Sequence, residues 1–119
     1  MMEMCEEMWT PISSSIQGGL EGAEIFINQS ASHGFCGKTR YRLYHINDNL
    51  YKNGGIYIYS NFRGCGGSRL YYDGTSCISL NGSLLKIDES FSLDDVNVIT
   101  ATVDLNEVRS HRIAFKARG

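Results

Sequence analysis

Cys5 is the residue in this 119-residue sequence with the clearest capacity for covalent chemistry. A cysteine at the end of a strand, where the chain turns sharply toward a helix, exposes its sulfur and directs the next backbone N–H toward a substrate. Such a thiol can attack a carbonyl or nitrile carbon and form a thioester-type intermediate. The competing interpretation is a near-terminal cysteine of no special role, since most single cysteines are small buried hydrophobic residues.

A nucleophilic thiol needs a base or a cation nearby, and the negative charges of Glu6 and Glu7 would raise a thiol pKa by repulsion rather than lower it. His33 could form a Cys–His dyad with Cys5, because both residues can lie at the ends of adjacent strands. Nothing in the sequence supplies the third group that would orient such a histidine. We therefore expect His33 to be a solvated loop residue.

The elements that position these residues predict an α/β fold with a mixed sheet. Apolar and β-branched runs predict strands at 1–4, 23–28, 56–60 and 96–103. Asn81-Gly82 separates two further apolar runs, 77–80 and 83–87. This pair predicts a hairpin, because both turn residues need a positive φ.

Helices are expected at 12–20, 38–52 and 104–110. Gly22 is a plausible stop for the first helix, and Asp104 can cap the last one. Residues 29–37 and the glycine-rich 63–68 are expected to be loops.

The composition, with 42% hydrophobic and 20% charged residues, is that of a globular chain. The formal net charge of −2 offers no footprint for phosphates, so nucleic-acid binding is not expected. No apolar run is long enough for a transmembrane helix, and no signal-peptide pattern is visible, so we expect a cytoplasmic protein without membrane contact. The four cysteines are too scattered for a zinc site, and we expect free thiols rather than disulfides.

Four segments together carry a resemblance to a known family. They are CEEMWTP at 5–11, KNGGIYIYSN at 52–61, RLYYDG at 69–74 and FSLDDVNVITATVDLNEVRS at 91–110. In this order and spacing they resemble the glutaminase domain of eukaryotic glutamine-dependent NAD+ synthetases, a branch of the nitrilase (carbon–nitrogen hydrolase) superfamily. The resemblance implies an α-β-β-α sandwich with a Glu-Lys-Cys catalytic set. The Glu is the general base, the Lys stabilises the tetrahedral intermediate, and the Cys attacks the glutamine amide.

Carried over residue by residue, the resemblance makes Cys5 the nucleophile and the backbone N–H of Glu6 an oxyanion-hole donor. Ser32 matches a glutamine-binding serine. Lys38 matches a basic residue near the substrate carboxylate, where a cation suits an amino-acid substrate. The family pattern differs at three positions, Gly34, Gly66 and Ser68, where it has a histidine and two acids.

The catalytic Glu and Lys of the family lie upstream of its cysteine, and no residue of this chain matches either. The resemblance therefore implies that residues 1–119 are the C-terminal half of the glutaminase domain, with the N-terminal half missing. It implies no cofactor in this chain, because ATP and deamido-NAD+ belong to the synthetase domain that receives the ammonia. We expect the chain to be inactive, or nearly so, without its partners.

Two other readings stay open. One is another nitrilase-like amidase with a different amide or nitrile substrate. The other is a truncated interaction module without activity. Half a sandwich leaves apolar sheet surface uncovered, which favours pairing with the missing half or self-association into a homo-oligomer.

Overall fold

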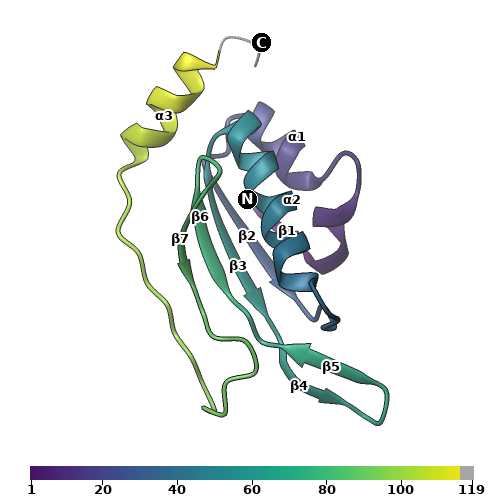
Figure 1. The fold of residues 1–119 in the computed structure, drawn as a ribbon. Coiled ribbons are helices and arrows are strands. Elements are labelled where there is room, and N and C mark those ends of the chain that lie inside the picture. The colour runs from purple at the N-terminus through teal and green to yellow at the C-terminus, as the bar shows by residue number, and fades with distance from the viewer. Residues whose placement is uncertain (116–119) are drawn as a thin grey trace.

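Five strands form one mixed sheet in the order β1-β2-β3-β6-β7 (Figure 1). The structure is a computed structural model that describes residues 1–115. The strands are β1 (Met2–Met4), β2 (Ile25–Ser30), β3 (Ile56–Asn61), β6 (Cys77–Leu80) and β7 (Ser83–Ile87). The first three are parallel, whereas β6 and β7 pair antiparallel. The predicted α/β class with a mixed sheet is confirmed.

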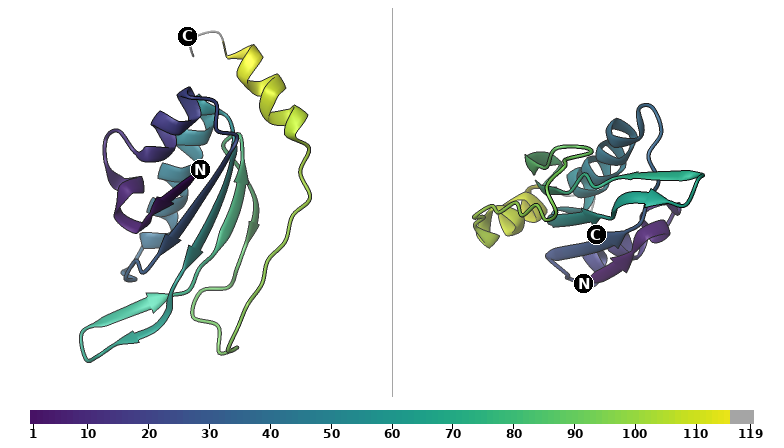
Figure 2. Two further views of the ribbon diagram at one scale, coloured as in Figure 1. Left: turned by 180° about the vertical axis from the view of Figure 1, so that it is seen from behind. Right: turned by 90° about the horizontal axis from the view of Figure 1, so that it is seen from below.

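Three helical segments cover one face of this sheet (Figures 1 and 2). They are the 3-10 helix η1 (Cys5–Trp9), α1 (Ser14–Leu20) and α2 (Lys38–Asn53). Ile46 and Leu50 of α2 are buried against Phe26 and Tyr57 of the sheet. Because Ile46 and Leu50 share one face of the helix, their burial holds α2 together through the poor helix formers between them.

The other face of the sheet meets α3 (Leu105–Ala114) and the extended chain that leads to it (Figure 2). Ile99 and Val103 of this chain pack with Val108 on a buried cluster from β3 and β6. The predicted strand at 96–103 is wrong, since these residues are extended but join no strand ladder. The segment crosses the face of the sheet rather than following an edge, so its β-branched residues pack without pairing.

The glycine-rich segment predicted as a loop is instead the start of a hairpin. The strands β4 (Arg63–Gly66) and β5 (Leu70–Asp73) pair antiparallel and project from the end of β3 (Figure 1). A Cβ at Gly66 would lie 2.9 Å from the ring of Tyr72, so the glycine allows the close cross-strand contact. The prediction failed because glycines normally weaken strands.

The local turn signals predicted the structure well. Asn81 and Gly82 adopt φ of 50° and 91° in the turn between β6 and β7. The side chain of Asp104 accepts a hydrogen bond from the backbone N–H of Asn106 and caps α3. The predicted second strand is present but lies two residues later, over Ile25–Ser30.

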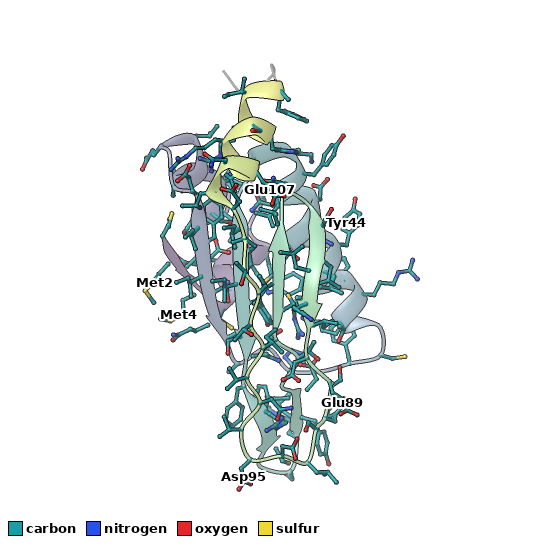
Figure 3. The ribbon with its side chains drawn as sticks, turned by 90° about the vertical axis from the view of Figure 1, so that its left-hand side faces the viewer. Met2, Met4, Tyr44, Glu89, Asp95 and Glu107 are labelled. Carbon is teal, nitrogen blue, oxygen red and sulfur yellow. The ribbon has the colours of Figure 1, made fainter. Side chains whose placement is uncertain are left out.

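Part of the face opposite the helices is apolar and uncovered. Met2, Met4, Ile25 and Ile58 point away from the helical layer and are exposed. Figure 3 looks onto this side, where Met2 and Met4 project at the β1 edge, away from the extended chain. In soluble proteins a contiguous exposed apolar patch indicates a surface that packs on something else.

We predict that Leu50→Ala lowers the free energy of unfolding by about 2–5 kcal/mol, because the change leaves a cavity under α2. The side chain of Leu50 is 0% exposed, whereas that of Leu20 is 61% exposed. Urea unfolding followed by circular dichroism measures the change, and Leu20→Ala is the matched control. Equal effects of the two substitutions would contradict this account of the core.

Candidate active site

Cys5 lies where β1 ends and η1 begins, as expected for a nucleophile at a strand-to-helix turn. Its φ is +43°, in the left-handed region that non-glycine residues rarely adopt. Such strained residues cluster at functional sites, where the surrounding contacts hold them. The residue is partly exposed.

Ser32 lies at the end of the sheet where the parallel strands β2 and β3 finish. Ser32 follows β2, and Asn61 ends the neighbouring β3. The amide of Asn61 accepts a hydrogen bond from the Ser32 N–H at 2.8 Å and donates one to the Ser32 carbonyl at 3.0 Å. Ser32 is buried, and both its N–H and its carbonyl are hydrogen-bonded. These bonds fix the backbone where the loop after β2 begins.

Lys38 begins α2 and turns its ammonium group toward aromatic rings. Its Nζ lies 4.3 Å from the ring centre of Trp9 and 4.8 Å from that of Phe35. Partial burial and then the charge of Arg42 lower the Lys38 pKa, while Asp73 and Cys5 act in the opposite direction. Cys5 is the smallest of these four influences on the Lys38 pKa, so a weak electrostatic interaction relates these two predicted residues.

His33 stays in the exposed loop, as expected. Its ring lies 6.3 Å from that of Phe35, and its backbone forms a bridge with Tyr72 of β5. The next residue, Gly34, donates a backbone hydrogen bond to Tyr71 at 2.6 Å. The hairpin therefore braces the loop between β2 and α2.

Beneath the loop that carries Ser32 lies a buried ion pair that the sequence did not reveal. Arg42 of α2 approaches Asp73 of β5 at 3.3 Å, and the two side chains are 1% and 4% exposed. Asp73 also accepts hydrogen bonds from the Asn61 amide at 2.7 Å and the Thr75 N–H at 3.1 Å. The Arg42 guanidinium lies 4.9 Å from the ring centre of Tyr59, and burial raises the pKa of that phenol.

One sequence signal could have found Arg42. It lies four and eight positions before Ile46 and Leu50, on the stripe of α2 that faces the sheet. A charged residue on an otherwise buried stripe implies a buried partner. Asp73 gave no matching signal, because Asp-Gly also reads as an ordinary turn.

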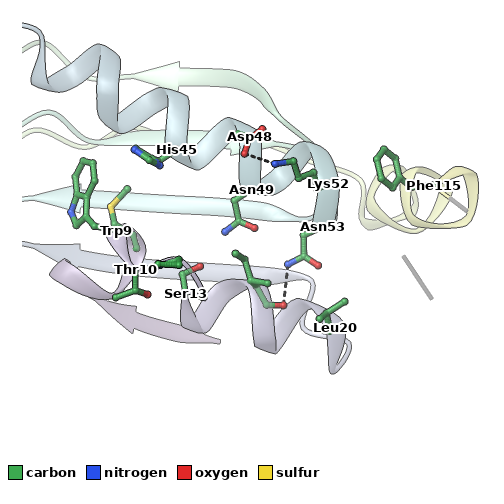
Figure 4. A pocket seen from close by; sticks show the side chains of 13 residues that line it. Trp9, Thr10, Ser13, Leu20, His45, Asp48, Asn49, Lys52, Asn53 and Phe115 are labelled. Atoms are coloured by element: carbon green, nitrogen blue, oxygen red, sulfur yellow. Dashed lines mark hydrogen bonds and ion pairs between the residues drawn. The ribbon is translucent and has the colours of Figure 1, made fainter. Parts of the chain in front are cut away.

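Two hollows lie near these elements. One, of about 440 Å³, is lined by residues of the loop after β2 together with Lys38, Tyr71, Asp73 and Phe91. The other, of about 550 Å³, lies between α1 and α2 on the outer side of the helices, and Figure 4 shows its lining from Trp9 to Phe115. Within residues 1–115, Cys5 lines neither hollow.

The four cysteines are all free thiols. Cys77 is buried in the core, and burial raises its pKa to about 12, so this thiol stays protonated and unreactive at neutral pH. No group of three metal-ligating side chains lies together among residues 1–115. Within the same range, no helix combines the length and apolarity needed to cross a membrane.

A partly exposed residue at a positive φ, where a parallel strand turns into a helix, occupies the kind of position at which some hydrolases carry a nucleophile. A family model described as carbon–nitrogen hydrolase matches residues 2–113. The chain belongs to the carbon–nitrogen hydrolase family.

Within this family, the chain is similar to glutamine-dependent NAD(+) synthetases. It is 53% identical over 116 residues to the one from Dictyostelium discoideum and 50% identical over 117 residues to the one from Saccharomyces cerevisiae. Each match covers 98% of this chain but only 16% of the relative, so the chain spans about a sixth of the relatives' length. The resemblance described from the sequence is confirmed.

Solved structures agree with this placement. A glutamine-dependent NAD(+) synthetase from Cytophaga hutchinsonii superposes with a TM-score of 0.71 at 29% identity, covering 84% of this chain and 16% of that one. A carbon–nitrogen hydrolase from Helicobacter pylori has a TM-score of 0.83 at 18% identity, covering 96% of this chain and 43% of that one. The predicted nitrilase-type fold is confirmed.

The buried pair generates a stability prediction. We expect Asp73→Ala to lower the free energy of unfolding by about 3–5 kcal/mol, because it leaves the Arg42 charge buried without a partner. Replacing both residues, as Arg42→Met with Asp73→Leu, should recover part of this loss, since no unpaired charge remains.

Urea unfolding measures both changes. The surface pair Lys52–Asp48, at 2.7 Å and largely exposed, supplies the control through Lys52→Met. If Asp73→Ala costs no more stability than Lys52→Met, the buried pair does not have the role given to it.

Proposed function

We propose that this chain supplies the nucleophile of a glutaminase whose product is ammonia. The observation that carries the proposal is Cys5, held at a positive φ where β1 ends and η1 begins. Relatives about 50% identical to nearly the whole chain are named glutamine-dependent NAD(+) synthetases, which supports glutamine as the substrate.

In the proposed reaction the Cys5 thiolate attacks the side-chain amide carbon of glutamine. The carbonyl oxygen becomes an oxyanion, which the backbone N–H of Glu6 stabilises. Collapse of this intermediate breaks the carbon–nitrogen bond, and the nitrogen leaves as ammonia with the proton that the thiol gave up. Water then hydrolyses the thioester, which releases glutamate and restores the thiol. The Lys38 ammonium pairs with the α-carboxylate of the substrate, and Ser32 contacts the substrate beside it.

The general base and the lysine that stabilises the intermediate come, in this proposal, from a second half of the same domain. Residues 1–119 form the C-terminal half. The exposed apolar face at Met2, Met4, Ile25 and Ile58 is the surface that the other half covers. The match to 43% of the Helicobacter pylori hydrolase supports this division.

The fate of the ammonia follows from the same relatives. We infer that it passes to a synthetase domain, which uses ATP to convert deamido-NAD+ to NAD+ in the cytoplasm. In this scheme ATP and deamido-NAD+ bind outside the present chain.

A chimera tests the proposal. This chain replaces the aligned 117 residues of the Saccharomyces cerevisiae relative, and NAD+ formation is measured with glutamine or with ammonium salt as nitrogen source. We expect activity with both, because the 50% identity preserves the shape of the domain. Cys5→Ser should abolish the activity with glutamine and leave that with ammonium unchanged, since free ammonia bypasses the thiol.

The ammonium arm shows that the synthetase part of the chimera is intact, and a melting temperature like that of the parent relative shows that the exchanged segment is folded, so the result with glutamine can be interpreted. A chimera that uses ammonium but not glutamine would contradict the proposal. Ammonia release from another amide, with glutamine inert, would assign the chain to a different amidase.

A further inference from the structure

Two carboxylates flank Cys5, and the proposed chemistry uses neither side chain. Glu3 lies two residues before the cysteine and is only 4% exposed, while Glu7 lies two residues after it at the surface. The left-handed backbone of Cys5 is unfavourable for a residue that carries a Cβ. Contacts around the turn must therefore hold it in place.

Glu3 ties the end of β1 to its surroundings through hydrogen bonds that it accepts at both oxygens. Oε2 accepts from the backbone N–H of Ser15 at 2.9 Å. Oε1 accepts from the Asn28 amide at 3.4 Å and from the hydroxyl of Tyr57. Burial and the neighbouring Glu3 raise the Tyr57 pKa, so this hydroxyl keeps the proton that it donates. One carboxylate thereby joins β1 to β2, β3 and α1.

Glu7 closes the turn on its other side. Its Oε2 accepts a hydrogen bond from the backbone N–H of Met4 at 2.5 Å. Its Oε1 accepts from the Ser14 hydroxyl at 3.2 Å. The side chain spans Cys5, connecting the residue before the cysteine with the start of α1.

We propose that Glu3 and Glu7 are positioning residues that hold the Cys5 turn in its left-handed conformation. They anchor the two sides of the turn to adjacent residues, Ser15 and Ser14, in the first turn of α1. Neither glutamate touches the substrate. This inference rests on the proposed function, because it concerns the geometry of the same thiol.

The two sites respond differently to glutamine in place of glutamate. At position 7 the amide oxygen can still accept from the Met4 N–H, and the amide nitrogen can donate to the Ser14 hydroxyl, which also accepts hydrogen bonds. At position 3 the amide nitrogen must face either the Ser15 N–H or the Asn28 amide, and both are donors. Glu7→Gln should therefore preserve the turn, and Glu3→Gln should not.

The chimera described above tests this inference. We expect Glu7→Ala and Glu3→Gln to lower kcat with glutamine by about 10- to 100-fold, as a misplaced nucleophile does, with little change in KM. Activity with ammonium should stay at the parent level, and Glu7→Gln should regain most of the lost kcat. Glu21→Gln, at an exposed glutamate after the far end of α1, is the control that changes charge alone.

Three outcomes would overturn the inference. They are an unchanged kcat in Glu7→Ala and Glu3→Gln, equal losses in Glu7→Ala and Glu7→Gln, and a parallel loss with ammonium, which would mean a general structural role.

Alkylation of the 119-residue chain separates this inference from the proposed function. With Cys36 and Cys65 changed to Ser, and Cys77 buried, iodoacetamide reports Cys5. Glu7→Ala and Glu7→Gln remove the same charge, so a severalfold difference between their alkylation rates measures the hydrogen bond to Met4. That difference supports a positioning role for Glu7 even if the parent chimera does not hydrolyse glutamine. Equal alkylation rates contradict this role.

Discussion

The buried ion pair between Arg42 and Asp73 is the interaction on which the arrangement of the site depends. Two charges taken out of water are costly unless hydrogen bonds satisfy them, and here Asn61 and Thr75 supply those bonds to Asp73. The Asn61 side-chain amide in turn forms hydrogen bonds with both the backbone N–H and the carbonyl of Ser32. The same carboxylate therefore connects α2, the β4–β5 hairpin and the loop after β2.

The two faces of the sheet differ in composition, and we relate this difference to the site on one face and to packing on the other. Toward the helices, the row Glu3, Asn28 and Tyr59 places polar groups near the edge where the parallel strands end. Away from the helices, the row Met2, Ile27 and Ile58 is apolar. Chemistry needs satisfied polar groups that hold a rigid geometry, whereas packing against another layer needs apolar area. The alternation of side chains along each strand provides both from the same strands.

Features encoded within a few residues could be predicted from the sequence. The Asn81-Gly82 turn, the Asp104 cap and the strand at 56–60 depend on local backbone preferences, and all three are present. The strand expected at 96–103 failed because this segment packs on the face of the sheet and not beside an edge strand, which tertiary structure decides. Arg42 and Asp73 lie 31 positions apart, so only the folded chain shows that their charges meet.

The acidic residues around Cys5 show most clearly what the sequence alone misrepresents. Read along the chain, Glu6 and Glu7 are negative charges beside a thiol that would work better without them. In the folded structure, Glu7 is a hydrogen-bond acceptor for the backbone before the cysteine, and Glu3 accepts from three separate elements. Protein donors form hydrogen bonds to the carboxylates of Glu3 and Glu7. Their main effect on the thiol is therefore to position the backbone that carries it. An acid next to a nucleophile can therefore stabilise the strained turn that makes the nucleophile accessible.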